Sequence, residues 1–137
     1  MPSTPVDPDG GAGAFPEALA PARAPIGELG RVHFIAVGGT GMGSLAGLLK
    51  RRGIEVTGSD KVLYPPMSLA LADWGIEPVV GFDPAHLAAA ASPSGRTPDL
   101  VVIGNAVRPD NPEAAAAIAS GIPYRSFSDA LFELAMA

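Results

Sequence analysis

The sequence predicts an α/β protein, built as a Rossmann-like three-layer domain around a five-stranded, mainly parallel sheet. A short apolar strand at 32–37 runs directly into a glycine-rich turn at 38–43, and an apolar helical pattern follows the turn. A β-branched run at 99–103 has the continuous hydrophobicity typical of a parallel strand covered on both faces. From residue 31 onward, strand and helix patterns alternate, which is the order of a parallel sheet with right-handed crossovers.

Composition limits the classes of protein to consider. The 137 residues suffice for one domain, and we divide them into a flexible Pro-, Gly- and Ala-rich tail at 1–28 and a folded domain at 29–137. The chain has no cysteine and no apolar run that could span a bilayer, so we expect a soluble, cytoplasmic protein with no membrane partner. The net charge of -5 argues against nucleic acid as a partner.

Glycine and proline set the expected limits of each element. Strands are expected at 32–37, 54–58, 77–80, 99–103 and 122–125, and Pro78 places the third of them near an edge of the sheet. Helices are expected at 41–52, 66–74, 84–90, 112–120 and 128–136. Gly53 stands where a left-handed cap should end the first helix, and Gly75 and Gly121 end two others. Helix N-caps are expected at Asp83, at Asp110 or Asn111, and at Ser128.

Four loops follow the carboxyl ends of strands, at 38–43, 59–60, 81–83 and 104–106. Ligands of parallel α/β sheets bind at this edge. The first loop is a candidate anion site, because glycines let the backbone approach a phosphate and the helix N-terminus stabilises its charge. A tight turn that merely lets the helix pack closely is the alternative interpretation.

The glycine loop matches the dinucleotide fingerprint G-x-G-x-x-G only in part. Gly39 and Gly41 fit, whereas Ser44 stands at the third position. Asp60 lies 19 residues after Gly41, where that fingerprint places an acid that binds ribose. A solvated residue of a turn is an equally good interpretation of Asp60, and the same two interpretations apply to Ser59.

Other polar residues give weaker signals. Asn105 ends a buried strand and would face the ligand crevice, although turn formation explains it almost as well. We expect His33 to be a packed or edge histidine and His86 to lie on the surface. Arg108 and Arg125 are expected to be solvated, with an approach to a phosphate as the alternative.

Several kinds of chemistry have no matching sequence. The chain contains no G-x-x-x-x-G-K-[ST] loop for ATP, no metal-ligand spacing, and no convincing Ser-His-Asp set. The residues alone therefore indicate a binding domain for a nucleotide-like anion, without catalytic groups of its own.

Three segments in order resemble the N-terminal domain of the Mur ligases of peptidoglycan synthesis. They are HFIAVGGTGMG at 33–43, VTGSD at 56–60 and YPPMS at 64–68. With GFDP at 81–84 and VIGNA at 102–106, they are most similar to the branch of the family that recycles murein peptide. The resemblance covers about residues 31 to 136 and leaves the tail outside it.

The resemblance implies an ATP-dependent ligase of cell-wall synthesis. In that family ATP phosphorylates the carboxylate of UDP-N-acetylmuramate, and the amine of an incoming peptide attacks the acyl phosphate. The N-terminal domain holds the UDP-sugar, so the resemblance implies a UDP-N-acetylmuramate-binding domain. The residues carried over by position are Gly38, Gly39, Thr40, Gly41, Met42, Gly43, Ser59, Asp60, Asn105 and Ala106.

The family also assigns a role to each of these groups. The loop at 38–43 would meet the diphosphate through backbone N–H groups, with Thr40 adding a hydroxyl. Ser59 and Asp60 would face the uridine, and Asn105 with Ala106 would border the diphosphate or the sugar. Gly41→Val is expected to abolish UDP-sugar binding and leave the fold largely intact, because only the backbone approach would be blocked.

The family's central domain, with its glycine-rich Lys-Thr loop, and its C-terminal domain should follow the last helix. ATP and Mg²⁺ are expected for the full-length ligase, whereas this chain should bind no cofactor and be inactive alone. Two other interpretations stay open: an NAD(P)-binding domain of an oxidoreductase, and a non-catalytic sugar-nucleotide-binding module.

Overall fold

The computed structural model describes residues 29–136, so the expected tail at 1–28 lies outside the described residues. Its centre is a five-stranded sheet in which every neighbouring pair of strands is parallel, with the order β3-β2-β1-β4-β5. The strands are β1 (Arg31–Ile35), β2 (Glu55–Asp60), β3 (Val79–Val80), β4 (Leu100–Ile103) and β5 (Tyr124–Ser126). The prediction of a Rossmann-like α/β domain is confirmed, and so is the edge position of the third strand.

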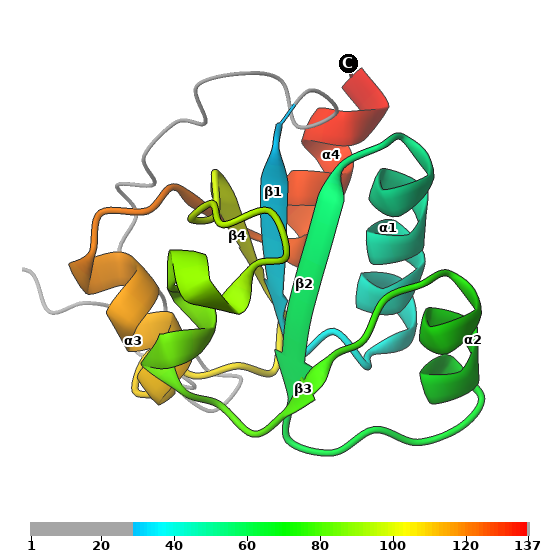
Figure 1. Cartoon of the computed structure of the whole chain (residues 1–137), viewed down its shortest axis with the longest axis horizontal. Coiled ribbons are helices and arrows are strands. Elements are labelled where there is room, and N and C mark those ends of the chain that lie inside the picture. The colour runs from blue at the N-terminus through cyan, green and yellow to red at the C-terminus, as the bar shows by residue number, and fades with distance from the viewer. Residues whose placement is uncertain (1–28, 137) are drawn as a thin grey trace, which may run out of the picture.

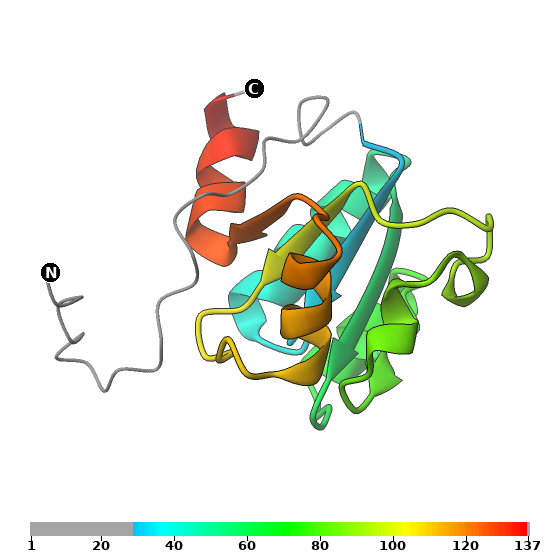
Figure 2. The ribbon, with the colours of Figure 1, turned by 90° about the vertical axis from the view of Figure 1, so that its left-hand side faces the viewer.

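Helices cover both faces of the sheet and make three layers (Figure 1). On one face lie α1 (Thr40–Arg51), α2 (Met67–Asp73) and α4 (Phe127–Met136). On the other lie α3 (Pro112–Ala119) and two short 3₁₀ turns, η2 (Pro84–Leu87) and η3 (Ala89–Ala91). Figure 2 shows the same arrangement after a quarter turn, with α3 in front of the sheet. No helix within 29–136 is both long enough and apolar enough to cross a membrane.

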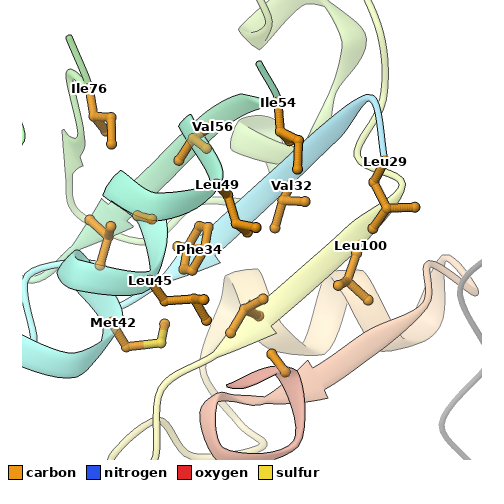
Figure 3. Packing of buried hydrophobic residues seen from close by; sticks show 14 of the residues in the cluster. Leu29, Val32, Phe34, Met42, Leu45, Leu49, Ile54, Val56, Ile76 and Leu100 are labelled. Carbon is orange, nitrogen blue, oxygen red and sulfur yellow. The ribbon is translucent and has the colours of Figure 1, made fainter. Parts of the chain in front are cut away.

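The alternation of side chains along β1 separates two cores. Val32 and Phe34 point into the larger core, which is closed by α1 and α2 (Figure 3). Ile35 belongs to the smaller core beneath α3, together with Val101 and Ile103 of β4. Both Val32 and Phe34 are fully buried, so the apolar strand run anchors the domain.

Glycines end three helices as predicted. Gly53, Gly75 and Gly121 have φ of 89°, 78° and 73°, which is the left-handed conformation that side chains disfavour. An isoleucine follows each glycine, and its N–H bonds to the carbonyl five residues earlier, which closes a Schellman motif. The sequence pair Gly-Ile thus stops a helix and starts the return toward the sheet.

The expected helix at 84–90 is wrong, because the chain forms η2 and η3 there. In an α-helix the carbonyls of His86 and Ala88 would accept N–H groups four residues later. The Arg31 guanidinium donates to both, with Nη2 bonded to His86 O at 2.8 Å and Nη1 to Ala88 O at 3.2 Å, and Ala88 O also accepts from Ala91 N in the tighter 3₁₀ pattern. The buried arginine therefore competes with helix formation in this segment.

The ends of other elements differ from the expectation in two places and agree with it in two others. β2 extends through Asp60, so residues 59 and 60 belong to the strand rather than to a loop after it. Asn111 is the N-cap of α3, with Oδ1 accepting from Glu113 N and Ala114 N, and Asp83 caps η2 as expected. The expected cap at Ser128 is wrong, because α4 begins at Phe127 and Ser126 Oγ accepts from the Asp129 N–H.

Candidate functional site

The glycine loop opens the N-terminus of α1 toward solvent. Gly39 is the N-cap with an extended backbone, no side chain caps the helix, and no acid lies in its first turn. The first N–H groups of α1 are therefore free of side-chain acceptors, and the positive end of the helix dipole lies at the loop. This is the arrangement that binds anions in α/β proteins.

The backbone of Ala36, two residues before this loop, is strained. Ala36 has φ of 73°, which costs about 1–2 kcal/mol for a residue with a side chain. Two bonds hold the turn, since Ala36 N and Val37 N both donate to Ser59 O, at 2.8 and 3.0 Å. Backbone strain of this kind persists where the surroundings fix it, and it is concentrated at binding sites.

A cavity of about 360 Å³ lies in front of the loop. Its walls come from the carboxyl ends of β1, β2 and β4 and from the first turns of α1 and α4. The lining residues are Ala36, Gly39, Gly41, Met42, Asp60, Gly104, Asn105, Ala106 and Phe127. The size lies within the range of small-molecule sites.

The cavity brings together six of the residues expected at the site. They are Gly39, Gly41, Met42, Asp60, Asn105 and Ala106. Gly38, Gly43 and Ser59 are not among the lining residues, and the Thr40 side chain lies outside the described part of the structure. Gly104 belongs to the expected loop at 104–106, whereas Ala36 and Phe127 were not expected at the site, and of these two Phe127 carries the large side chain.

Asp60 is bound to the glycine loop. Its Oδ2 accepts from Gly38 N at 2.7 Å, and its Oδ1 accepts from Lys61 N at 2.7 Å. A Cβ at Gly38 would lie 2.7 Å from the same Oδ2, so only glycine lets the carboxylate close onto the loop. Each carboxylate oxygen can accept more than one hydrogen bond, so Asp60 can hold the loop and still meet a ligand.

Two residues expected at the site, Ser59 and Gly43, make their contacts away from the cavity. The Ser59 side chain is fully buried, and its Oγ donates to Glu113 Oε2 at 2.5 Å. Gly43 lies against the Met67 side chain, in the space that a Cβ would fill. Ser59 therefore serves the interior with its hydroxyl, and Gly43 serves the packing of α2 on α1.

Gly41 has a neighbour that the sequence did not reveal. A Cβ there would lie 2.7 Å from Phe127 Cζ, because the ring covers the first turn of α1. The reason expected for Gly41→Val is therefore wrong: the substitution would displace Phe127 as well as block the backbone. Phe127 also packs against the larger core, so that displacement reaches beyond the site.

A buried polar cluster lies behind the site, on the α3 face of the sheet. The Glu113 carboxylate is fully buried and accepts from His33 Nε2 at 2.6 Å and from His86 Nδ1 at 2.5 Å. It also accepts from Ser59 Oγ and, at 3.1 Å, from Asp83 N. The four donors satisfy both oxygens of a charge that would otherwise be costly to bury.

The cluster corrects one prediction and agrees with another. His86 was expected at the surface, but its side chain is 16% exposed and bonded to Glu113, because η2 turns it under α3. His33 is packed, as expected, with its Nδ1 2.7 Å from Thr57 Oγ1. β1 begins at Arg31, one residue before the expected strand, and this places Arg31 and His33 on one buried face, where both side chains need partners.

The partners indicate how the cluster is protonated. Burial lowers the pKa of His33, which favours the neutral imidazole. The Glu113 carboxylate can only accept, so the single imidazole proton lies on Nε2, and Nδ1 accepts from the Thr57 hydroxyl, which also accepts from Arg31 Nε at 3.1 Å. Burial acts to raise the pKa of Glu113, but hydrogen bonds from His33, Ser59 and His86 outweigh it and bring the pKa below its ordinary value.

The two arginines expected to be solvated do not line the cavity. Arg108 is exposed, with Nε 3.7 Å from Asp110 Oδ1. Arg125 is only 12% exposed, and its Nε donates to Glu133 Oε2, so it is more buried than expected. Within 29–136 no three His, Cys, Asp or Glu side chains are placed to hold a metal ion.

The chain is similar in sequence to known proteins. The sequence profile described as "Mur ligase family, catalytic domain" matches residues 31–137. The UDP-N-acetylmuramate--L-alanyl-gamma-D-glutamyl-meso-2,6-diaminoheptandioate ligase of Escherichia coli K12 is 46% identical over 96 residues, which cover 70% of this chain and 20% of that protein. The UDP-N-acetylmuramate--L-alanine ligase of Arthrobacter sp. FB24 is 46% identical over 105 residues, 76% of this chain and 20% of its own length.

A solved structure of a ligase of this kind is also similar to the chain. The murein peptide ligase of Psychrobacter arcticus 273-4 superposes with a TM-score of 0.66 and 39% identity, over 75% of this chain and 20% of that one. The chain thus spans about a fifth of the length of the curated relatives that it matches. With a family profile over most of its length and relatives at this identity, the chain belongs to the Mur ligase family.

Proposed function

We propose that this chain is the UDP-N-acetylmuramate-binding domain of an ATP-dependent Mur ligase. The observation that carries the proposal is the uncapped N-terminus of α1, which opens into a cavity bordered by Asp60 and by the loop at 104–106. The relatives support the choice of ligand, because both kinds are named for UDP-N-acetylmuramate.

In this proposal each part of the cavity meets one part of the ligand. The diphosphate lies at the first N–H groups of α1, where the helix dipole favours its charge. Asp60, which ends β2, faces the uridine, and Asn105 with Ala106 borders the diphosphate or sugar. Met42 and Phe127 add apolar walls that exclude water and so strengthen the backbone–phosphate contacts.

The rest of the reaction belongs to parts of a ligase that residues 31–137 do not supply. ATP and Mg²⁺ would bind a central domain, and the amine that attacks the acyl phosphate would be held beyond this chain. Relatives that add L-alanine and relatives that add a murein peptide match at the same 46% identity, and we favour murein-peptide recycling because of the YPPMS and GFDP segments. Such a ligase would act in the cytoplasm on a soluble nucleotide sugar.

Calorimetric titration of the chain with UDP-N-acetylmuramate tests the proposal, with UDP and NAD as parallel titrants. We expect the UDP-sugar to bind, UDP to bind more weakly, and NAD to give no heat. Tight binding of NAD, with no heat from the UDP titration, would instead support a dinucleotide-binding domain of an oxidoreductase.

A matched pair of variants places the ligand in the cavity. Asp60→Ala removes a lining carboxylate that also holds Gly38, and we expect it to weaken UDP-sugar binding at least about ten-fold. Asp73→Ala removes an exposed carboxylate on α2, away from the cavity, and should bind like the unmodified chain. Equal weakening in both variants would remove Asp60 from the site.

A further inference from the structure

The last two residues of β2 bond to two segments at the carboxyl edge of the sheet, the glycine loop and the segment after β3. Ser59 O accepts the N–H groups of 36 and 37, and Asp60 Oδ2 accepts the N–H of 38. On the other side, Asp60 O accepts the N–H of Gly81 at 2.7 Å. The position of residues 59 and 60 therefore determines where the glycine loop and the segment after β3 lie.

Glu113 holds this connection from within the protein. One carboxylate oxygen accepts the Ser59 hydroxyl at 2.5 Å, and the other accepts the Asp83 N–H at 3.1 Å. Glu113 reaches them from the first turn of α3, where the Asn111 cap fixes the helix start and the dipole favours the negative charge. Its own side chain is fully buried and does not line the cavity.

We propose that Glu113 is a positioning residue for the UDP-sugar site, which it organises by fixing Ser59 and Asp83 and thereby the loops at 36–38, 59–60 and 81–83. The inference rests on the proposed function for its ligand. Its structural half, that Glu113 orders these loops, stands on the hydrogen bonds alone.

The chemistry of the partners predicts how substitutions differ. Glu113→Ala leaves the His33, Ser59, His86 and Asp83 donors without their acceptor, so the loops lose their common anchor. In Glu113→Gln, the amide oxygen can accept from Asp83 and His86. The amide N–H groups can donate to Ser59 Oγ and to His33 Nε2, if His33 moves its proton to Nδ1. The conservative variant should therefore keep the geometry.

The experiment combines amide hydrogen exchange with titration of the full chain by UDP-N-acetylmuramate. For Glu113→Ala we expect exchange at 36–38 and at Gly81 to rise about ten-fold or more, and UDP-sugar affinity to fall on the order of ten-fold. Glu113→Gln should restore both to within about three-fold of the unmodified chain.

Val101→Ala is the matched control for lost stability. Val101 is a fully buried register partner of His33 and bonds to none of the Glu113 donors through its side chain. The Val101→Ala variant should be less stable. Its amide exchange at 36–38 and Gly81 and its affinity for UDP-N-acetylmuramate should stay near those of the unmodified chain. Equal exchange in Glu113→Ala and Val101→Ala would overturn the positioning role, whether or not the ligand binds. If the unmodified chain does not bind UDP-N-acetylmuramate, the proposed function is overturned, but the ordering of the loops by Glu113 is not.

Discussion

At the scale of single residues, the glycines of the first loop have three different physical tasks. Gly38 admits the Asp60 carboxylate, Gly41 admits the Phe127 ring, and Gly43 admits the Met67 side chain. The sequence alone predicts only that the loop is tight, because a glycine motif does not reveal which distant side chain fills the space it leaves. Close packing, one of the two interpretations that the sequence left open, thus applies to Gly41 and Gly43, whereas Gly38 makes room for a carboxylate. Phosphate binding by the same loop is part of the proposed function.

The contact between Gly41 and Phe127 predicts a compensating pair. We expect Gly41→Ala to lower the free energy of unfolding by about 1 kcal/mol or more, because the new methyl group overlaps the Phe127 ring tip. Phe127→Leu removes the overlapping atoms and should reduce that loss. Urea unfolding of the two single variants and the double variant measures a coupling energy, expected to be about 0.5 kcal/mol or larger. Simple additivity would mean that the ring moves aside without cost.

The residues of the Glu113 cluster were the hardest to predict. Glu113 looks like an ordinary acid in a helix N-terminal turn, and His33 and His86 each fit unremarkable positions when taken singly. Their contacts join residues 80 and 27 positions apart, which no local pattern encodes. A strand that begins at Arg31, one residue earlier than expected, places Arg31 and His33 on one buried face and would have indicated that acceptors lie opposite them.

At the scale of elements, local signals predicted most of the fold. The three Gly-Ile helix ends and the apolar strand runs are decided by conformation and burial within a few residues, so the sequence shows them directly. The predicted helix at 84–90 is wrong because the conformation of this segment depends on Arg31, which is more than 50 residues away in the sequence. An alanine-rich pattern favours a helix only where no distant donor takes its carbonyls.

The packing of α1 on α2 gives a prediction at this scale. Gly47 faces Trp74, and a Cβ there would lie 2.5 Å from Cε3 of the ring. Alanine favours the helix by about 1 kcal/mol, but overpacking costs about 1–3 kcal/mol, so we expect Gly47→Ala to lower stability on balance. Trp74 is the only tryptophan, so its fluorescence reports the displacement directly.

The control for this variant lies on the same helix. Ser44 is exposed, and Ser44→Ala should keep the emission of Trp74 and raise stability by a few tenths of a kcal/mol through helix propensity, of order 0.5 kcal/mol at most. A Gly47→Ala protein that is more stable and has unchanged emission would show that α2 adjusts freely.

At the scale of the whole molecule, the buried cluster makes stability depend on pH. Burial lowers the pKa of His33 from its ordinary value of 6.5, so the unfolded chain binds a proton there more readily than the folded one. Stability should then be complete above pH 6.5 and fall as the pH drops below it, with a slope of at most about 1.4 kcal/mol per pH unit. The lowered pKa of Glu113 adds a second loss, which begins below its ordinary value of 4.5.

Urea unfolding at pH 7, 6 and 5 measures this dependence. His33→Gln should be less stable at pH 7 and show a shallower decline between pH 7 and pH 5, because one titrating group is gone. Val101→Ala, which titrates nothing, should be destabilised by the same amount at each pH. Parallel curves for His33→Gln and the unmodified chain would assign the decline to other groups.

The unlike cores on the two sides of β1 also decide how the strands align. A slip of β1 by one residue would bring the guanidinium of Arg31 and the imidazole of His33 to face α1, among Leu45 and Leu49, and would turn Phe34 toward Glu113. Charged or polar groups without partners in an apolar core cost several kcal/mol, so Arg31 and His33 exclude this misaligned sheet. The buried arginine and histidine thereby give the central strand a single permitted alignment during folding.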